Sequence, residues 1–132
     1  MKKILLDTNA FTALAYGNEK VREFLSQADK IYLPYVVVAE LFYGFKKGNR
    51  ETKNRAVLKA FEAKLEVTRI YATAETLEIY SEVFLELKNN GTPIPVNDVW
   101  IAACAIETGS VVVTFDKHFT NISKLRLWQK LK

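Results

Sequence analysis

The sequence contains only one cysteine and one histidine, and it has no long apolar run. With no second thiol in the chain, Cys104 cannot form an internal disulfide, and its apolar neighbours indicate a small core residue. Such a composition suits a reducing compartment, so we expect a cytoplasmic protein.

Membrane insertion and secretion both require apolar segments that this chain lacks. The longest apolar runs, residues 32–39 and 100–106, are far shorter than the roughly 20 residues that a membrane-spanning helix needs. Near the N-terminus, Asp7 and Asn9 interrupt the apolar run too early for a secretory signal. No membrane partner is expected, and 132 residues with 49% apolar content predict one compact domain, residues 1–132.

The net charge of +4 is modest, but the basic residues are unevenly distributed. Residues 46–64 hold seven lysines or arginines against two glutamates. After Asp116 the chain carries basic residues and no acid: Lys117, Lys124, Arg126, Lys130 and Lys132. A solvated surface and a polyanionic partner explain these segments equally well.

Apolar runs alternate with helical patterns along the chain, which is typical of an α/β fold. Strands are predicted at residues 4–6, 31–33, 67–70, 111–114 and 125–128. Helices are predicted at residues 10–16, 19–27, 34–47, 51–65 and 74–88, and from Asn97 up to Gly109, with residues 120–123 as a connection. Continuous apolar strands without polar alternation indicate a parallel sheet that is covered on both faces.

Two helical patterns also predict which side chains face the sheet. In the helix at residues 34–47, Val37, Leu41 and Gly44 recur on one stripe, and Glu40 falls on the same stripe. A buried carboxylate needs a basic partner, a proton or a cation, unless the helix is rotated enough to expose it. In the helix at residues 74–88, the expected buried face consists of Leu77, Tyr80, Phe84 and Leu87.

Three aspartates stand where elements of the predicted sheet and its helices begin or end. Asp7 and Asp116 follow apolar strands. Asp98 lies in the first turn of the helix that begins at Asn97, its expected cap, and this helix is expected to be buried because residues 99–106 are apolar nearly all round. Helix capping alone would explain each of them. Ligands of open parallel sheets, however, bind beyond the carboxyl ends of the strands, and all three aspartates and Glu40 can reach one such edge.

Four converging carboxylates would repel one another by about 4 kcal/mol per pair at 4 Å and an effective dielectric near 20. A hard divalent cation offsets this repulsion, and a set of oxygen ligands selects Mg²⁺ or Mn²⁺ over Zn²⁺. Setting these four aside leaves 11 of the 15 acidic side chains against 19 basic ones. A basic surface around an acidic metal pocket is what metal-dependent cleavage of a nucleic-acid backbone requires.

These residues belong to motifs that resemble, in order and spacing, those of PIN-domain ribonucleases of the VapC toxin type. The motifs are Leu6-Asp7-Thr8-Asn9, Ala39-Glu40-Leu41 with Gly44, Ile94-Pro95-Val96-Asn97-Asp98, Ile101-Ala102-Ala103 with Ala105, and Thr114-Phe115-Asp116-Lys117-His118-Phe119. The resemblance covers the whole chain. It implies a PIN-like three-layer α/β/α fold with a central parallel sheet in the order 3-2-1-4-5.

The resemblance also implies a site and an activity. Its metal-binding catalytic acids match Asp7, Glu40, Asp98 and Asp116, and its supporting polar residues match Thr8, Asn9 and Thr114. We expect an Mg²⁺-dependent endoribonuclease that hydrolyses RNA with a metal-activated water, forms a homodimer and is held inactive by a cognate antitoxin. Lys46, Lys47, Arg50 and Lys53 are the expected RNA contacts. The resemblance also implies that His118 belongs to a structural His-Phe motif, and we assign it no catalytic role because the sequence shows no orienting partner for it.

Other functions fit parts of the same pattern. An aspartyl phosphotransferase of the haloacid dehalogenase type needs a second acid two residues after Asp7, where Asn9 stands. A non-catalytic RNA-binding PIN module would use the basic segments without needing four acids. A PIN nuclease that serves RNA processing is the nearest alternative to the toxin.

Overall fold

The computed structural model describes residues 1–128, so Lys130 and Lys132 of the basic tail lie outside the described residues. Its centre is a five-stranded parallel sheet in the order β3-β2-β1-β4-β5, which confirms the predicted order. The strands are β1 (Lys3–Leu6), β2 (Lys30–Pro34), β3 (Thr68–Ile70), β4 (Val111–Val113) and β5 (Arg126–Leu127).

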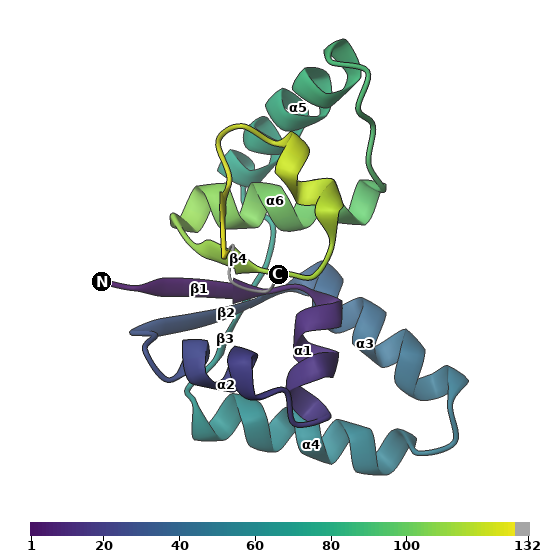
Figure 1. The fold of residues 1–132 in the computed structure, drawn as a ribbon. Helices are drawn as coiled ribbons and strands as arrows, with labels where there is room; N and C mark the ends of the chain where they lie inside the picture. Colours follow the sequence, from purple (N-terminus) through teal and green to yellow (C-terminus); the bar gives the residue numbers. More distant parts are fainter. Residues whose placement is uncertain (129–132) are drawn as a thin grey trace.

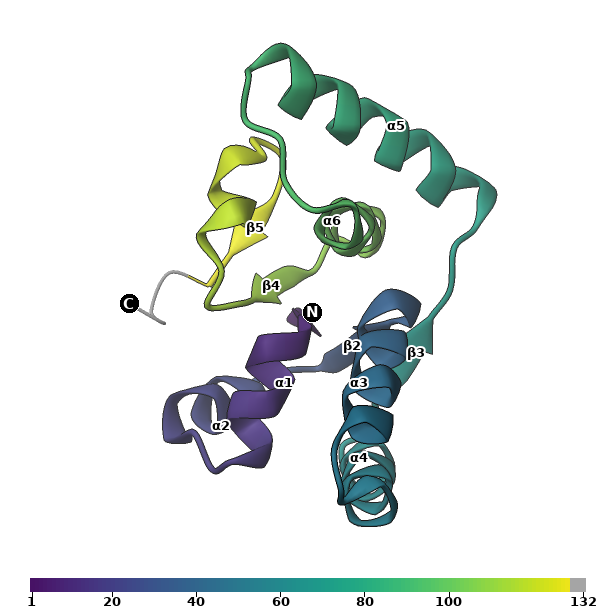
Figure 2. The ribbon, with the colours of Figure 1, turned by 90° about the vertical axis from the view of Figure 1, so that its right-hand side faces the viewer.

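Helices cover both faces of this sheet and so form the three predicted layers. Figures 1 and 2 show α5 and α6 on one face and α1 to α4 on the other. The helices are α1 (Thr8–Ala15), α2 (Glu19–Leu25), α3 (Tyr35–Lys47), α4 (Glu51–Lys64), α5 (Ala74–Asn89) and α6 (Val96–Thr108), with a 3₁₀ helix η1 (Lys117–Asn121). Across residues 1–128, every helix is too short or too polar to reach from one side of a bilayer to the other.

The core combines strands and one helix that are apolar nearly all round with the inward faces of the other helices. Ile4, Leu5 and Leu6 of β1 are completely buried, as a central strand covered on both faces requires. Helix α6 is likewise buried along residues 101–105, and Cys104 lies within that stretch as predicted. This packing holds the carboxyl ends of β1 and β4 in fixed positions.

Proline and glycine set the limits of the elements that carry the acids. Pro34 ends β2 and precedes the first turn of α3, because its ring fits a helix start and it has no amide hydrogen to donate. Gly109 ends α6 in the left-handed conformation, with φ of 70°, which costs a residue without a Cβ little.

The predicted buried face of α5 is wrong in part. Leu77 and Phe84 are 54% and 41% exposed, whereas Thr76, Val83 and Leu87 are buried. Thr76 turns inward because its hydroxyl donates a hydrogen bond to Glu107 of α6. A polar residue therefore occupies the first inward position of α5, and the buried stripe is displaced by about one residue from the apolar one.

Three local predictions also need correction. Helix α1 begins at Thr8, two residues earlier than predicted, because Asp7 is its N-cap. Helix α6 begins at Val96, so Asn97 lies inside its first turn and is not the cap. Gly44 is exposed and does not belong to the stripe of α3 that faces the sheet. The short helix η1, which was not predicted, forms after Asp116 accepts the His118 N–H at 2.9 Å.

Candidate active site

The register of the sheet places two polar residues side by side where β1 and β4 end. Leu6 pairs with Val113, so the next residues of the two strands, Asp7 and Thr114, leave the sheet together. The chain reverses its order across the sheet at this β1/β4 seam, and such a switch point is the usual ligand site of open α/β sheets. The sheet therefore presents Asp7 at the position where chemistry is expected.

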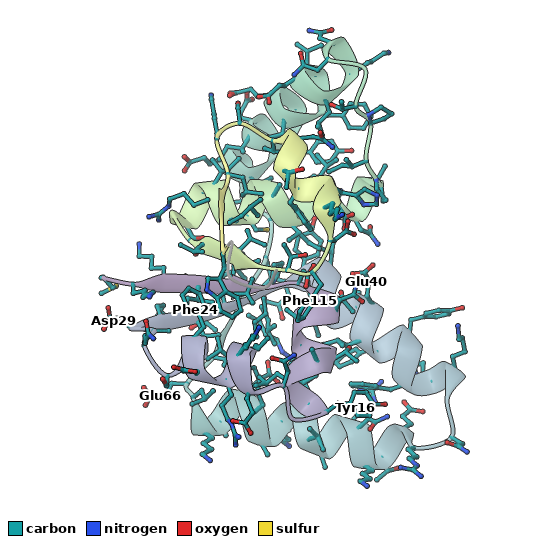
Figure 3. All side chains as sticks on the ribbon, in the orientation of Figure 1. Tyr16, Phe24, Asp29, Glu40, Glu66 and Phe115 are labelled. Atoms are coloured by element: carbon teal, nitrogen blue, oxygen red, sulfur yellow. The ribbon has the colours of Figure 1, made fainter. Side chains whose placement is uncertain are left out.

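All four predicted acids line one open hollow at this edge, which we call the acidic hollow. It has a volume of about 490 Å³. Its lining consists of Asp7, Thr8, Asn9, Glu40, Pro95, Val96, Asn97, Asp98, Ile101 and Asp116. Four separate segments of the chain supply the acids, and Figure 3 shows Glu40 on α3 beyond the ends of the strand arrows.

Asp7 is the most deeply buried of these acids, with 4% of its surface exposed. Its Oδ1 accepts the Ala10 N–H at 2.9 Å, and its Oδ2 accepts a hydrogen bond from the Thr114 hydroxyl. Burial raises the pKa of Asp7 to about 6, against the lowering effect of these two donors, and the charges of Asp98 and Asp116 raise it further. The site thus disfavours a charged Asp7 unless a cation is bound.

Asp98 lies in the first turn of α6, where the helix dipole favours a negative charge. Burial nevertheless raises its pKa, and the hydrogen bond to His118 opposes that effect. The charges of Asp116 and Glu40 raise the pKa of Asp98 as well. Repulsion from the neighbouring acids therefore adds to the effect of burial at Asp98.

Glu40 is held by two neutral donors. The Thr8 hydroxyl donates to its Oε1 at 2.5 Å, and the Asn97 side-chain amide donates to its Oε2 at 3.3 Å. Within residues 1–128, Glu40 forms no ion pair with a lysine or arginine, so the buried salt bridge that would explain it is not found there. Asn97, taken for a helix cap from the sequence, is thus a positioning residue for Glu40.

His118 contacts two of the acids, which the sequence did not reveal. Its Nδ1 lies 3.3 Å from Oδ2 of Asp98 and 3.0 Å from Oδ1 of Asp116. Ligand atoms of these three residues all lie within 4.8 Å of one another. The short helix η1 places the imidazole against these two acids, so His118 has the orienting partners that it appeared to lack.

The supporting and basic residues divide between the acidic hollow and its surroundings. Thr8 and Thr114 donate to Glu40 and Asp7, and Asn9 lines the hollow. The residues predicted to contact RNA lie at the far end of α3 and the start of α4; we call Lys46, Lys47, Arg50 and Lys53 the basic segment. None of the four lines the acidic hollow. Lys46 is partly engaged, since its Nζ lies 3.6 Å from Oε2 of Glu51.

The donor set fits a hard divalent cation. Every acidic ligand offers carboxylate oxygens, which Mg²⁺ and Mn²⁺ prefer, and the surrounding hydroxyls and amides orient those oxygens. Each carboxylate oxygen of Asp7 accepts one hydrogen bond and keeps a second lone pair free for a cation. A bound cation would also relieve the repulsion that raises the pKa values of Asp7 and Asp98.

Comparison with known proteins identifies the family of nearly the whole chain. The family model of the PIN domain matches residues 4–125. Ribonuclease VapC2 of Rickettsia felis is 34% identical over 111 residues, covering 82% of this chain and 81% of the relative. The tRNA(fMet)-specific endonuclease VapC of Salmonella typhimurium is 33% identical over 131 residues, covering 96% of this chain and 97% of the relative.

A solved structure agrees with these relatives. A chain of VapBC2 from Rickettsia felis, crystallised with a DNA fragment from its promoter, superposes with a TM-score of 0.83 at 30% identity. The match covers 96% of this chain and 97% of the other. The sheet order, the strand-end acids and these four matches lead to one conclusion: the chain belongs to the PIN-domain family, among the VapC proteins.

Proposed function

We propose that this protein is a metal-dependent endoribonuclease and the toxin component of a toxin–antitoxin pair. The observation that carries the proposal is the convergence of Asp7, Glu40, Asp98 and Asp116 on one hollow at the switch point of the sheet. Relatives of similar length that are named ribonucleases support the activity. Oxygen ligands on four separate segments would have no common purpose without a cation.

The four acids would hold Mg²⁺, or Mn²⁺ in its place. When bound, such a cation lowers the pKa of water and neutralises charge that develops on the phosphate and the leaving oxygen. The chain's own residues position the acids: Thr8 and Asn97 fix both oxygens of Glu40, and Thr114 fixes Asp7. This scaffold keeps the carboxylates in place before the cation arrives, which reduces the cost of binding it.

The substrate and partners follow from the same reasoning. RNA is the proposed substrate. An RNA strand bound at the acidic hollow would extend along the basic segment, whose lysine and arginine side chains bind phosphates. The VapBC structure supports a cognate antitoxin as the protein partner. We further propose a homodimer that acts in the cytoplasm.

Cleavage of RNA by the purified protein tests this function. A mixture of cellular RNAs should be cut internally with Mg²⁺ and left intact with EDTA, and Asp98→Asn should be inactive. Products should carry a 5′-phosphate, because water attacks the phosphorus and the 3′ oxygen leaves. Full activity in EDTA, or ends with a 2′,3′-cyclic phosphate, would contradict the proposal.

A further inference from the structure

A second hollow adjoins the acidic hollow along α3, and we call it the α3 hollow. It has a volume of about 530 Å³ and is lined by Val36, Ala39, Glu40, Tyr43 and Asn97. Glu40 and Asn97 line both hollows, so the two lie next to each other and share these side chains as a common wall. Anything that binds at the acids and extends along α3 therefore enters the α3 hollow.

Tyr43 stands at the outer wall of this hollow with 67% of its surface exposed. Tyr16 and Tyr71 are exposed to a similar or greater degree, but neither lines a hollow next to the acids. Tyr43 lies one turn after Glu40, so its ring follows the carboxylate on the same side of α3. It is the aromatic side chain that a ligand leaving the acidic hollow along α3 would meet.

The residue after Tyr43 gives independent support for a close-fitting ligand. Gly44 lies inside α3, where glycine costs roughly 1 kcal/mol relative to alanine. A Cβ at this position would meet nothing within 4 Å, so packing inside the chain gives no reason for a glycine there. Glycine in such a place keeps the helix backbone open to close approach from outside.

The charge beyond Tyr43 indicates what that ligand is. The Lys47 ammonium lies 5.7 Å from the centre of the Tyr43 ring, one helical turn further along α3. Arg50 and Lys53, both exposed, follow on the turn and the start of α4. An aromatic ring beside a row of cations is the arrangement with which proteins hold single-stranded nucleic acid, the ring stacking on a base and the cations meeting phosphates.

We propose that the α3 hollow is a nucleobase subsite for single-stranded RNA, with Tyr43 stacking on a base next to the cleaved phosphodiester. Lys47 contacts the phosphate of that nucleotide, and Gly44 lets the strand lie against α3. The inference rests on the proposed function, because it takes RNA as the substrate, and it adds the residue that selects unpaired RNA at the site. Base-paired RNA cannot stack on Tyr43 without unpairing.

Binding of a short single-stranded RNA that contains 2-aminopurine tests this subsite directly. The assay uses the Asp98→Asn background in EDTA, so it reports binding whether or not the protein cleaves RNA. Tyr43→Ala should weaken the affinity between about 5-fold and about 150-fold, the range for loss of one stacked base. Tyr43→Phe, which keeps the ring, should stay within about threefold of the parent, and Tyr16→Ala and Tyr71→Ala should match the parent.

An abasic substitution locates the stacked base. A set of RNAs is used, each lacking the base at one position. With the parent protein, the missing base should weaken binding at only one RNA position. With Tyr43→Ala, the missing base at that position should cause no further loss of affinity. With Asp98 restored and Mg²⁺ present, Tyr43→Ala should raise KM more than it lowers kcat, at an unchanged melting temperature.

Two results would overturn the subsite. Equal RNA affinity of Tyr43→Ala and the parent would do so, and it would leave the hollow to a protein segment such as the antitoxin. Equal loss with Tyr43→Phe would also do so, since a hydroxyl and not a stacking ring would then be responsible. The proposed function is tested separately by RNA cleavage. If the wild type cleaves RNA, the proposed function holds even where one of these two results rules out the subsite.

Discussion

Thr114 donates a hydrogen bond from its hydroxyl to Oδ2 of Asp7, across the seam between β4 and β1. The Thr114 hydroxyl oxygen in turn accepts the Asp116 N–H at 2.9 Å. One hydroxyl therefore connects the first acid of the chain to the last. Burial raises the pKa of Asp7, and the hydrogen bond from Thr114 opposes this effect, so it increases the charged fraction of Asp7 near neutral pH.

Replacing Thr114 should change the pH dependence of the site. In Thr114→Val the hydrogen bond that lowers the pKa of Asp7 is lost, so this pKa should rise above its value of about 6. Since metal ligands must be deprotonated, the acid limb of the activity profile should move to higher pH. Thr114→Ser keeps the hydroxyl and should retain the wild-type profile. Identical profiles for the valine and serine variants would show that the hydrogen bond does not tune Asp7.

Asp7 should destabilise the metal-free protein at neutral pH. Its folded pKa of about 6 lies above its ordinary value of 3.8, so between these values the folded protein binds more protons than the unfolded chain. The free energy of unfolding should therefore fall as pH rises through this window, by up to about 3 kcal/mol. Asp7→Asn removes this charge and keeps a side-chain oxygen for the α1 cap, so it should stabilise the protein at pH 7.

Urea denaturation in EDTA measures this effect at pH 4.5 and pH 7. Asp7→Asn should be more stable than the wild type at pH 7, and the difference should be clearly smaller at pH 4.5, near the lower end of this window. Glu78→Gln, a neutral replacement at an exposed position of α5, serves as the control and should match the wild type at both. Were Asp7 only a helix cap or a structural partner, Asp7→Asn would be the less stable protein at pH 7.

The strands and the acids at their ends were predictable because they depend on one-dimensional signals. A continuous apolar run marks a buried central strand, and the parallel register then carries Asp7 and the residues after β4 to the same edge. The family motifs supplied the sheet order. What the sequence could not give was which neutral groups orient the acids, since Asn97 and His118 meet Glu40 and Asp116 only after the chain has folded.

The orientation of surface helices was predictable only in part. Apolar spacing along α5 suggested Leu77 and Phe84 as inward residues, but the hydrogen bond from Thr76 to Glu107 turns a different stripe to the core. Periodicity reports which residues share a face, and a single polar contact with another helix can decide which face is buried. Gly44 shows the same limit, because its exposure depends on the rotation of α3.

Mg²⁺ should stabilise the wild-type protein and not the variants that lack a ligand. Binding to the folded state alone adds RT ln(1 + [L]/Kd), which is about 1.4 kcal/mol at ten times Kd. The melting temperature should be higher in Mg²⁺ than in EDTA for the wild type and for Glu78→Gln. For Asp98→Asn the two melting temperatures should be nearly equal. An equal shift in all three proteins would mean that Mg²⁺ binds elsewhere on the chain.

The basic segment should govern the salt dependence of RNA binding. Replacing Lys46, Lys47, Arg50 and Lys53 with glutamine should weaken binding and flatten the plot of log affinity against log salt, by about 0.7 for each lost phosphate contact. The melting temperature should change little, because surface ion pairs such as that of Lys46 with Glu51 contribute little to stability. Lys20→Gln combined with Lys88→Gln removes two exposed charges elsewhere and should leave the slope unchanged. Equal slopes for the quadruple variant and the wild type would assign the basic segment to ordinary solvated surface. A reduction in slope in both variants that is equal for each charge removed would indicate a response to net charge alone.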